Sequence, residues 1–159
     1  MDQTELLATR ADLFGSVFVI VQHLTRTADR ELADLGLTTR QWLLLAVLTK
    51  GFPDRSPSLS EAAEQYGSSR QNVKQIALGL ETSGFVRLVT DPHDARTTRI
   101  EVTKQVRLFD QPKMVRRSTA MLEDVFAGLT PDETGQLRDL AQRWLVSLAS
   151  APSRREQQP

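Results

Sequence analysis

Short stretches of the form Ser/Thr-x-x-Glu/Gln recur along this chain and divide it into separate helices. In such a capping box the first side chain accepts a hydrogen bond from the backbone N–H three residues on, and the Glu or Gln side chain accepts one from the first residue's N–H. Boxes of this form begin at Thr38, Ser58, Ser68 and Thr130, and the last has Pro131 at its first helical position. We therefore expect helices to start at these places.

The segment before the first box, from about Thr4 to Leu35, is predicted to be one long helix that ends at Gly36. Its apolar side chains recur every three or four residues, which places them on one side of a helix, and they are Leu7, Phe14, Val17, Val21, Leu24, Ala28 and Leu35. Phe18, Val19 and Ile20 widen this surface. A core helix would explain the pattern, but its breadth favours a dimerisation helix.

Two short helices are predicted in the middle of the chain. The box at Ser58 opens a helix that Gly67 closes, and the box at Ser68 opens one that runs to about Thr82 and ends at Ser83-Gly84. The second should bury Val73, Ile76, Ala77 and Leu80. Two short helices joined by a Gly-containing turn are typical of a helix-turn-helix.

A β-hairpin is predicted next. Residues 85–89 are rich in β-branched and aromatic side chains, and residues 98–102 alternate, with Ile100 and Val102 expected inward and Arg99 and Glu101 outward. Residues 90–97 between them are too polar for a core and should form the tip of a wing.

The remaining chain is predicted to be helical, with one helix over about 103–127 and another after Thr130. The fold class is mainly α with a small β-hairpin wing, a winged helix-turn-helix with further helices at both ends. The domain boundaries follow as residues 1–37 for the N-terminal helix, 38–103 for the winged helix-turn-helix, 104–150 for the C-terminal helices, and 151–159 for a disordered polar tail.

Composition argues against an enzyme. The 159 residues include no Cys and only two His, which leaves no disulfide, thiol nucleophile or Cys-ligated metal. No Gly-rich phosphate loop or nucleophile elbow is present, so we expect no catalytic residues, no cofactor and no metal. The N-terminus is acidic, and the longest uninterrupted apolar run is Val17–Val21, so neither a signal peptide nor a membrane span is expected and the protein should be cytoplasmic.

Charge is distributed unevenly along the chain. Twenty basic residues balance twenty acidic ones, yet between Gly67 and Leu80 the only charges are Arg70 and Lys74. Arg pairs with guanine, Asn and Gln with adenine, and Ser or Lys with phosphate. The residues predicted to contact double-stranded DNA from this helix are Ser68, Ser69, Arg70, Gln71, Asn72, Lys74 and Gln75. Since the apolar residues should pack inward, Arg70, Gln71, Lys74 and Gln75 are expected to face out.

The order of elements resembles the MarR family of bacterial transcriptional regulators. The motif resemblance is strongest from Gly84 to Thr103, where the chain reads Gly84-Phe85-Val86, Asp91-Pro92, Asp94-Ala95-Arg96 and Val102-Thr103. An Asp-x-Arg tripeptide is common by chance, but its place at a hairpin tip after a Gly-terminated helix is much more specific.

This resemblance implies a homodimer in which residues 1–37 and 104–150 are the N- and C-terminal dimerisation helices and residues 38–103 the DNA-binding domain. It also implies that the dimer binds a pseudo-palindromic operator, as a repressor, with two recognition helices about 34 Å apart. Arg96 is expected in the minor groove, with Asp94 holding its guanidinium by a salt bridge, and Thr97 and Arg99 are further wing contacts. Relatives often bind a small aromatic or anionic effector that releases DNA; His23 and Trp42 are candidates for that pocket, although an interface histidine and a core tryptophan explain them more simply.

One alternative function remains open from the sequence. A winged helix can lose specific DNA binding and act as a dimeric interaction or ligand-binding module. Ala95, where the family often has a second Arg, and the zero net charge agree with this alternative, whereas the acid-free recognition face argues against it. Retention on non-specific duplex DNA at low salt distinguishes the two.

Overall fold

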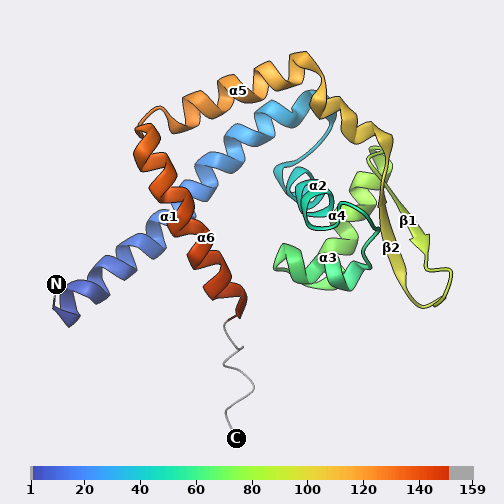
Figure 1. Ribbon diagram of the computed structural model, residues 1–159, viewed down its shortest axis with the longest axis horizontal. Coiled ribbons are helices and arrows are strands. Elements are labelled where there is room, and N and C mark those ends of the chain that lie inside the picture. Colours follow the sequence, from blue (N-terminus) through green and yellow to red (C-terminus); the bar gives the residue numbers. More distant parts are fainter. Residues whose placement is uncertain (1, 151–159) are drawn as a thin grey trace, which may run out of the picture. The chain divides into compact units, whose positions relative to one another are not determined.

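The computed structural model describes residues 2–150, and the chain divides into two compact units, residues 1–115 and 116–159. The predicted tail, 151–159, lies outside the described residues. The mainly helical fold class with one hairpin is confirmed (Figure 1). The elements in chain order are α1 (Gln3–Leu32), η1 (Ala33–Leu35), α2 (Thr39–Gly51), α3 (Leu59–Tyr66), α4 (Arg70–Thr82), β1 (Val86–Thr90), β2 (Thr98–Val102), η2 (Lys104–Asp110), α5 (Pro112–Phe126) and α6 (Pro131–Ser150).

Capping boxes start the helices at three of the four predicted places. Thr38 and Ser58 form complete boxes, and Thr130 exchanges the corresponding hydrogen bonds with Glu133. The box predicted at Ser68 is wrong by one residue, because Ser69 is the cap and accepts from the Asn72 amide at 3.2 Å.

The displacement of this box follows from the end of the preceding helix. Gly67 is left-handed, with φ of 71°, and the Ser68 amide donates to the Ala63 carbonyl at 3.0 Å. Ser68 therefore completes the C-terminal cap of α3 and is not free to begin α4.

The core of the first unit lies between α2, α3, α4 and the hairpin. α4 packs against α2, α3 and β1, and Figure 1 shows these elements gathered together. The four residues predicted to be buried on α4, Val73, Ile76, Ala77 and Leu80, are all buried. They share this core with Leu44, Leu48, Leu59, Phe85 and Ile100.

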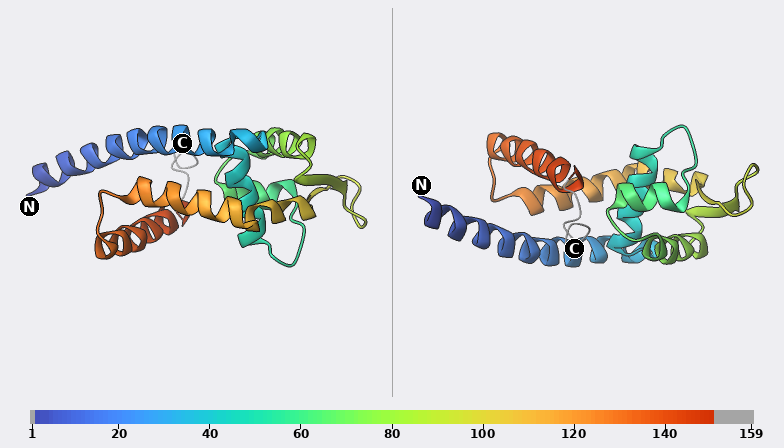
Figure 2. Two further views of the ribbon diagram at one scale, coloured as in Figure 1. Left: turned by 90° about the horizontal axis from the view of Figure 1, so that it is seen from above. Right: turned by 90° about the horizontal axis from the view of Figure 1, so that it is seen from below.

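The hairpin is attached to the helices along one edge. β1 and β2 are antiparallel, with Val86 opposite Val102 and Thr90 opposite Thr98. On the other side of β2, the Ile100 amide donates to the Pro57 carbonyl at 2.9 Å. Both views in Figure 2 show the hairpin tip projecting beyond α3 and α4, which is the arrangement predicted for a wing.

The single helix predicted over 103–127 is wrong, because the chain breaks before Pro112. Gln111 is extended, with φ of −67° and ψ of 140°. A proline ring clashes with helical backbone at the residue before it and has no N–H to donate. The segment is therefore the 3-10 helix η2 followed by α5.

Two helices carry many large apolar side chains that are exposed to solvent within residues 2–150. Within the first unit, Figure 2 shows the N-terminal half of α1 extending away from α2, α3 and α4. The exposed apolar residues of α1 as a whole are Leu7, Leu13, Phe14, Phe18, Val19, Ile20, Val21 and Leu24. Those of α6, in the second unit, are Leu137, Leu140, Trp144, Leu145, Val146 and Leu148. Among the helices of residues 2–150, none has the length and apolarity needed to cross a bilayer.

Candidate nucleic-acid interface

The outward face of α4 carries basic and amide side chains without any carboxylate in its N-terminal half. Arg70, Gln71, Lys74 and Gln75 are exposed, while the next residues around the helix are buried. One helical turn separates Arg70 from Lys74 and Gln71 from Gln75, so the four side chains form two adjacent rows. The face combines positive charge with donors and acceptors that match base edges in a major groove.

The other three residues predicted on this helix are engaged within the protein. Ser69 caps the helix, and the Asn72 side-chain amide donates to the Ser68 hydroxyl at 2.8 Å. Asn72 is half-buried. The structure thus separates the predicted set into four outward side chains and three that order the N-terminus of the helix.

The tip of the wing presents Arg96 to solvent. Its guanidinium makes no hydrogen bond or ion pair with any residue between 2 and 150, and its backbone amide donates to Asp94 Oδ1 at 3.0 Å. Asp94 Oδ2 accepts from the Thr97 hydroxyl at 2.8 Å. The predicted Asp94–Arg96 salt bridge is therefore wrong. An Asp carboxylate readily accepts a hydrogen bond from the backbone amide two residues later, and here it does so instead of pairing with the side chain of that residue.

Arg99 does not face outward as the alternation predicted. Its side chain is 34% exposed and forms an ion pair with Asp91, which is buried. Hydrogen bonds from the His93 amide and from Arg99 lower the pKa of Asp91 below its ordinary value of 3.8. The Arg99 side chain is thus held by its ion pair at the base of the wing, whereas the Arg96 side chain has no such contact within residues 2–150.

A second set of contacts fixes the end of α4 to the hairpin. Glu81 accepts from the Leu88 amide at 2.7 Å, and the Thr103 hydroxyl donates to the Gly84 carbonyl at 2.7 Å. Gln105 donates to the Ser83 carbonyl at 2.8 Å. These contacts set the wing at a fixed place relative to α4, and nothing in the sequence pattern alone identified Glu81 or Gln105 for this role.

α1 is joined to the start of α2 through a carboxylate. Asp29 Oδ1 accepts from both the backbone amide and the hydroxyl of Thr39, each at 2.7 Å. These hydrogen bonds lower the pKa of Asp29. The link ties the long helix to the helices that form the core of the first unit.

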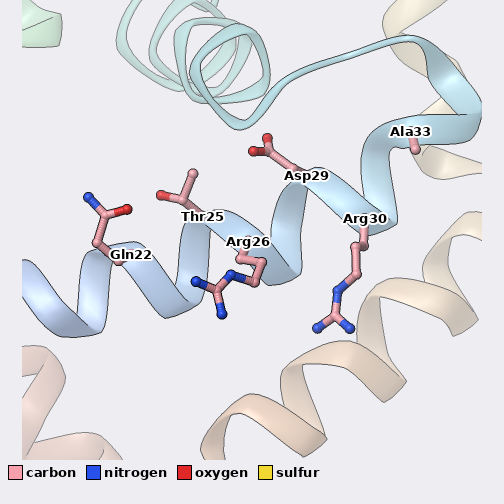
Figure 3. Close-up of a pocket in the computed structure, with 6 residues that line it drawn as sticks. All are labelled: Gln22, Thr25, Arg26, Asp29, Arg30 and Ala33. Carbon is pink, nitrogen blue, oxygen red and sulfur yellow. The ribbon is translucent and has the colours of Figure 1, made fainter.

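A shallow hollow lies along α1 beside this link. It measures about 460 Å³ and is lined by Gln22, Thr25, Arg26, Asp29, Arg30 and Ala33. Figure 3 shows Arg26 and Arg30 projecting to the same side of the helix, away from Asp29. The two predicted ligand residues, His23 and Trp42, are exposed, but neither is among the residues that line this hollow. In the described part of the chain, no three His, Asp or Glu residues are grouped as metal ligands.

Comparison with known proteins identifies a matching family and a shared fold. Residues 35–97 match the sequence model of the MarR family. The transcriptional activatory protein BadR of Rhodopseudomonas palustris is 30% identical over 106 residues, which are 64% of this chain and 61% of BadR. The match thus spans about three fifths of that relative.

Solved structures share the fold over most of the chain. Sco3205 of Streptomyces coelicolor, a MarR family transcriptional regulator solved in complex with DNA, aligns with a TM-score of 0.71 and 22% identity over 98% of this chain and 96% of that one. BpsR of Bordetella bronchiseptica, whose DNA binding is regulated by 6-hydroxynicotinic acid, aligns with a TM-score of 0.69 and 19% identity over 84% of this chain and 98% of that one. The chain thus matches the MarR family of winged helix-turn-helix transcriptional regulators in sequence over residues 35–97 and shares the fold of solved members over most of its length.

Proposed function

We propose that the protein binds a pseudo-palindromic operator in double-stranded DNA as a homodimer, with α4 in the major groove and the wing tip in the minor groove. The observation that carries this proposal is the acid-free outward face of α4, where Arg70, Gln71, Lys74 and Gln75 are exposed above a fully buried apolar face. Side chains in the first turns of a recognition helix reach base edges, and the positive helix end favours phosphate. In a bacterial cell this activity belongs to the cytoplasm.

The homodimer is supported by the apolar surfaces of α1 and α6. A soluble monomer rarely exposes so many large apolar side chains on one helix, and burying them against a second copy is the ordinary solution. Two copies related by a two-fold axis place two α4 helices on half-sites about 34 Å apart.

The test is a salt series with two duplexes, the DNA upstream of the protein's own coding sequence and a scrambled duplex of the same composition. We expect selective binding that persists at about 150 mM salt and is lost in Arg70→Ala. Arg10→Ala, which removes one charge from an exposed site on α1, is the matched control and should bind like the wild type. Equal, purely salt-sensitive binding to both duplexes would contradict specific recognition, and no binding at low salt would favour the interaction-module function.

Repression is our proposal for the direction of regulation, because a dimer seated on a promoter excludes the polymerase. Deleting the gene should then raise transcription of the adjacent genes. A fall in those transcripts would instead indicate activation, the activity that BadR carries in its name.

We further propose that a small aromatic anion releases the DNA. The support is the hollow on α1, where Arg26 and Arg30 offer two guanidinium groups on one side of the helix, as Figure 3 shows. A carboxylate pairs well with a guanidinium group. Benzoate and 6-hydroxynicotinate should raise the melting temperature and lower DNA affinity, benzamide should do neither, and Arg26→Ala should abolish both responses. Identical responses to benzoate and benzamide would contradict an anion site.

A further inference from the structure

The start of the wing loop is built around the carboxylate of Asp91. Asp91 is 7% exposed, and its Oδ1 accepts from the amides of His93 at 2.7 Å and Asp94 at 3.2 Å. Its Oδ2 accepts from Arg99 Nε. The Asp91 amide donates to the Thr97 carbonyl at 2.9 Å and closes the loop. A buried carboxylate with three donors holds the backbone around it in one conformation.

Arg99 connects this loop to the helix-turn-helix. While its Nε donates to Asp91, its Nη1 donates to the Ser56 carbonyl at 2.9 Å and lies 3.9 Å from Glu61 Oε2. Glu61 also accepts from the Ser58 amide at 2.8 Å and so starts α3. One planar guanidinium therefore joins the wing to the segment that opens α3.

We propose that Arg99 is a positioning residue and not a DNA contact: with Asp91 it fixes the wing against the start of α3, so that Arg96 is held where the minor groove passes. The inference rests on the proposed DNA-binding function and assigns the two wing arginines different roles. Both were predicted DNA contacts.

A continuous series of hydrogen bonds supports this assignment. It runs from the Ser56 carbonyl through Arg99 to Asp91, and from Asp91 through the Asp94 amide. Asp94 then accepts from the Arg96 amide at 3.0 Å. Breaking it at Arg99 leaves the Asp91 carboxylate buried without its charged partner, which loosens the loop that carries Arg96.

The other ion pair on the hairpin supplies a matched control. Arg87 donates to Glu101 at 2.9 Å, and the Arg87 side chain is 71% exposed. This pair links only the two strands, so Arg87→Gln removes the same charge without touching the attachment to α3.

The first measurement is amide hydrogen exchange in the free protein. In Arg99→Gln, the hydrogen-bonded amides of the loop should exchange at least about tenfold faster than in the wild type, while those of α4 stay protected. These loop amides are those of Asp91, His93, Asp94, Arg96 and Thr97. Asp91→Asn should give the same pattern, Arg99→Lys should restore part of the protection, and Arg87→Gln should leave it unchanged. Unchanged exchange in both Arg99→Gln and Asp91→Asn would overturn the proposal.

The second measurement is a double-mutant cycle for DNA binding across a salt series. Arg96→Ala alone should weaken binding about tenfold and flatten the plot of log K against log salt by about 1.8, because the dimer loses one charge at each half-site. In an Arg99→Gln background, Arg96→Ala should have little further effect, because the contact is already lost. If Arg99 touches phosphate itself, the two losses add and each flattens the plot separately, which would overturn the positioning role. Wild-type affinity in Arg99→Gln would overturn it too.

The two readouts separate this inference from the function on which it rests. If the wild-type protein binds no DNA at any salt concentration, the proposed function fails. Faster exchange at residues 91–97 in Arg99→Gln, with Arg87→Gln unchanged, still supports the attachment of the wing by Arg99. Unchanged exchange overturns that attachment whether or not DNA binds.

Discussion

The winged region and the two end helices use apolar residues in opposite ways. In the winged region the large apolar side chains, such as Leu44, Leu80, Phe85 and Ile100, are buried within one chain. Along α1 as far as Leu24 and along α6, comparable side chains are exposed. The same periodic pattern of apolar residues therefore produces a core within one chain in the first region and an exposed apolar surface in the second.

The difference lies in what surrounds each helix. α4 contacts α2, α3 and β1, whereas the exposed half of α1 extends beyond the rest of its unit (Figure 2). The winged region should then keep its stability as the protein is diluted, and the end helices should depend on a second copy.

The largest effect is expected from truncating the core. Phe85 is 1% exposed and packs against Phe109 with ring centroids 5.9 Å apart. Phe85→Ala should lower the free energy of unfolding by about 3–5 kcal/mol at every protein concentration. Chemical denaturation measures this loss. Phe14→Ala, at a site 61% exposed, is the control and should cost far less at dilutions where the protein is monomeric. Equal losses under those conditions would abolish the contrast between the two regions.

The next effect concerns the exposed surface of α1. Phe14 and Phe18 stack edge to face with centroids 5.0 Å apart on this surface. Phe18→Asp should weaken dimerisation by about 2 kcal/mol or more, over tenfold in Kd, because a charge would be buried at the interface. Sedimentation velocity across concentrations measures it, with Phe18→Leu as the conservative control. A wild-type protein that stays monomeric at high concentration would refute the proposed dimer.

A smaller effect is expected at the junction between α4 and the wing. Gly84 has φ of +80°, and a Cβ there would lie 2.7 Å from Gln105 Oε1. Gly84→Ala should cost about 1–2 kcal/mol of stability, because an L-residue is strained in this conformation and Gln105 must move. Thermal denaturation measures the cost. Gly128→Ala meets no atom within 4 Å and should be nearly neutral. If the two variants melt alike, the junction is less constrained than its geometry indicates.

The sequence predicted the elements well because their signals are local. Thr38, Ser58 and Thr130 form hydrogen bonds within their own first helical turn, and Gly67 and Gly84 adopt left-handed backbone that few other residues accept. Such signals need no knowledge of distant segments.

The contacts of Arg99 could not be predicted from the sequence, because they join segments that are distant along the chain. Arg99 contacts the Ser56 carbonyl 43 positions earlier, and strand alternation places Arg99 outward without revealing what covers it. The expected Asp94–Arg96 salt bridge does not form, because the Asp94 carboxylate accepts a hydrogen bond from the Arg96 backbone amide instead. Pro112 was a local signal of a helix break, and the apolar period on both sides of it masked that signal.

The smallest effect is expected in the pH dependence of stability, to which a capping glutamate from each region contributes. Hydrogen bonds from Ser58, with a further contribution from Arg55, lower the pKa of Glu61 from 4.5 to about 2, and hydrogen bonds from Thr130 lower that of Glu133 as well. Because the folded-state pKa of Glu61 is lowered, its contribution to stability is complete above pH 4.5 and is lost as the pH falls toward 2. The Glu61 side chain is 40% exposed, so solvent screening limits the loss to about 1 kcal/mol. Glu61→Gln keeps the capping hydrogen bond, because Gln also fits the capping box. The variant should show a flatter pH dependence of the melting temperature between pH 5 and 2. An unchanged slope would assign the acid sensitivity to other carboxylates.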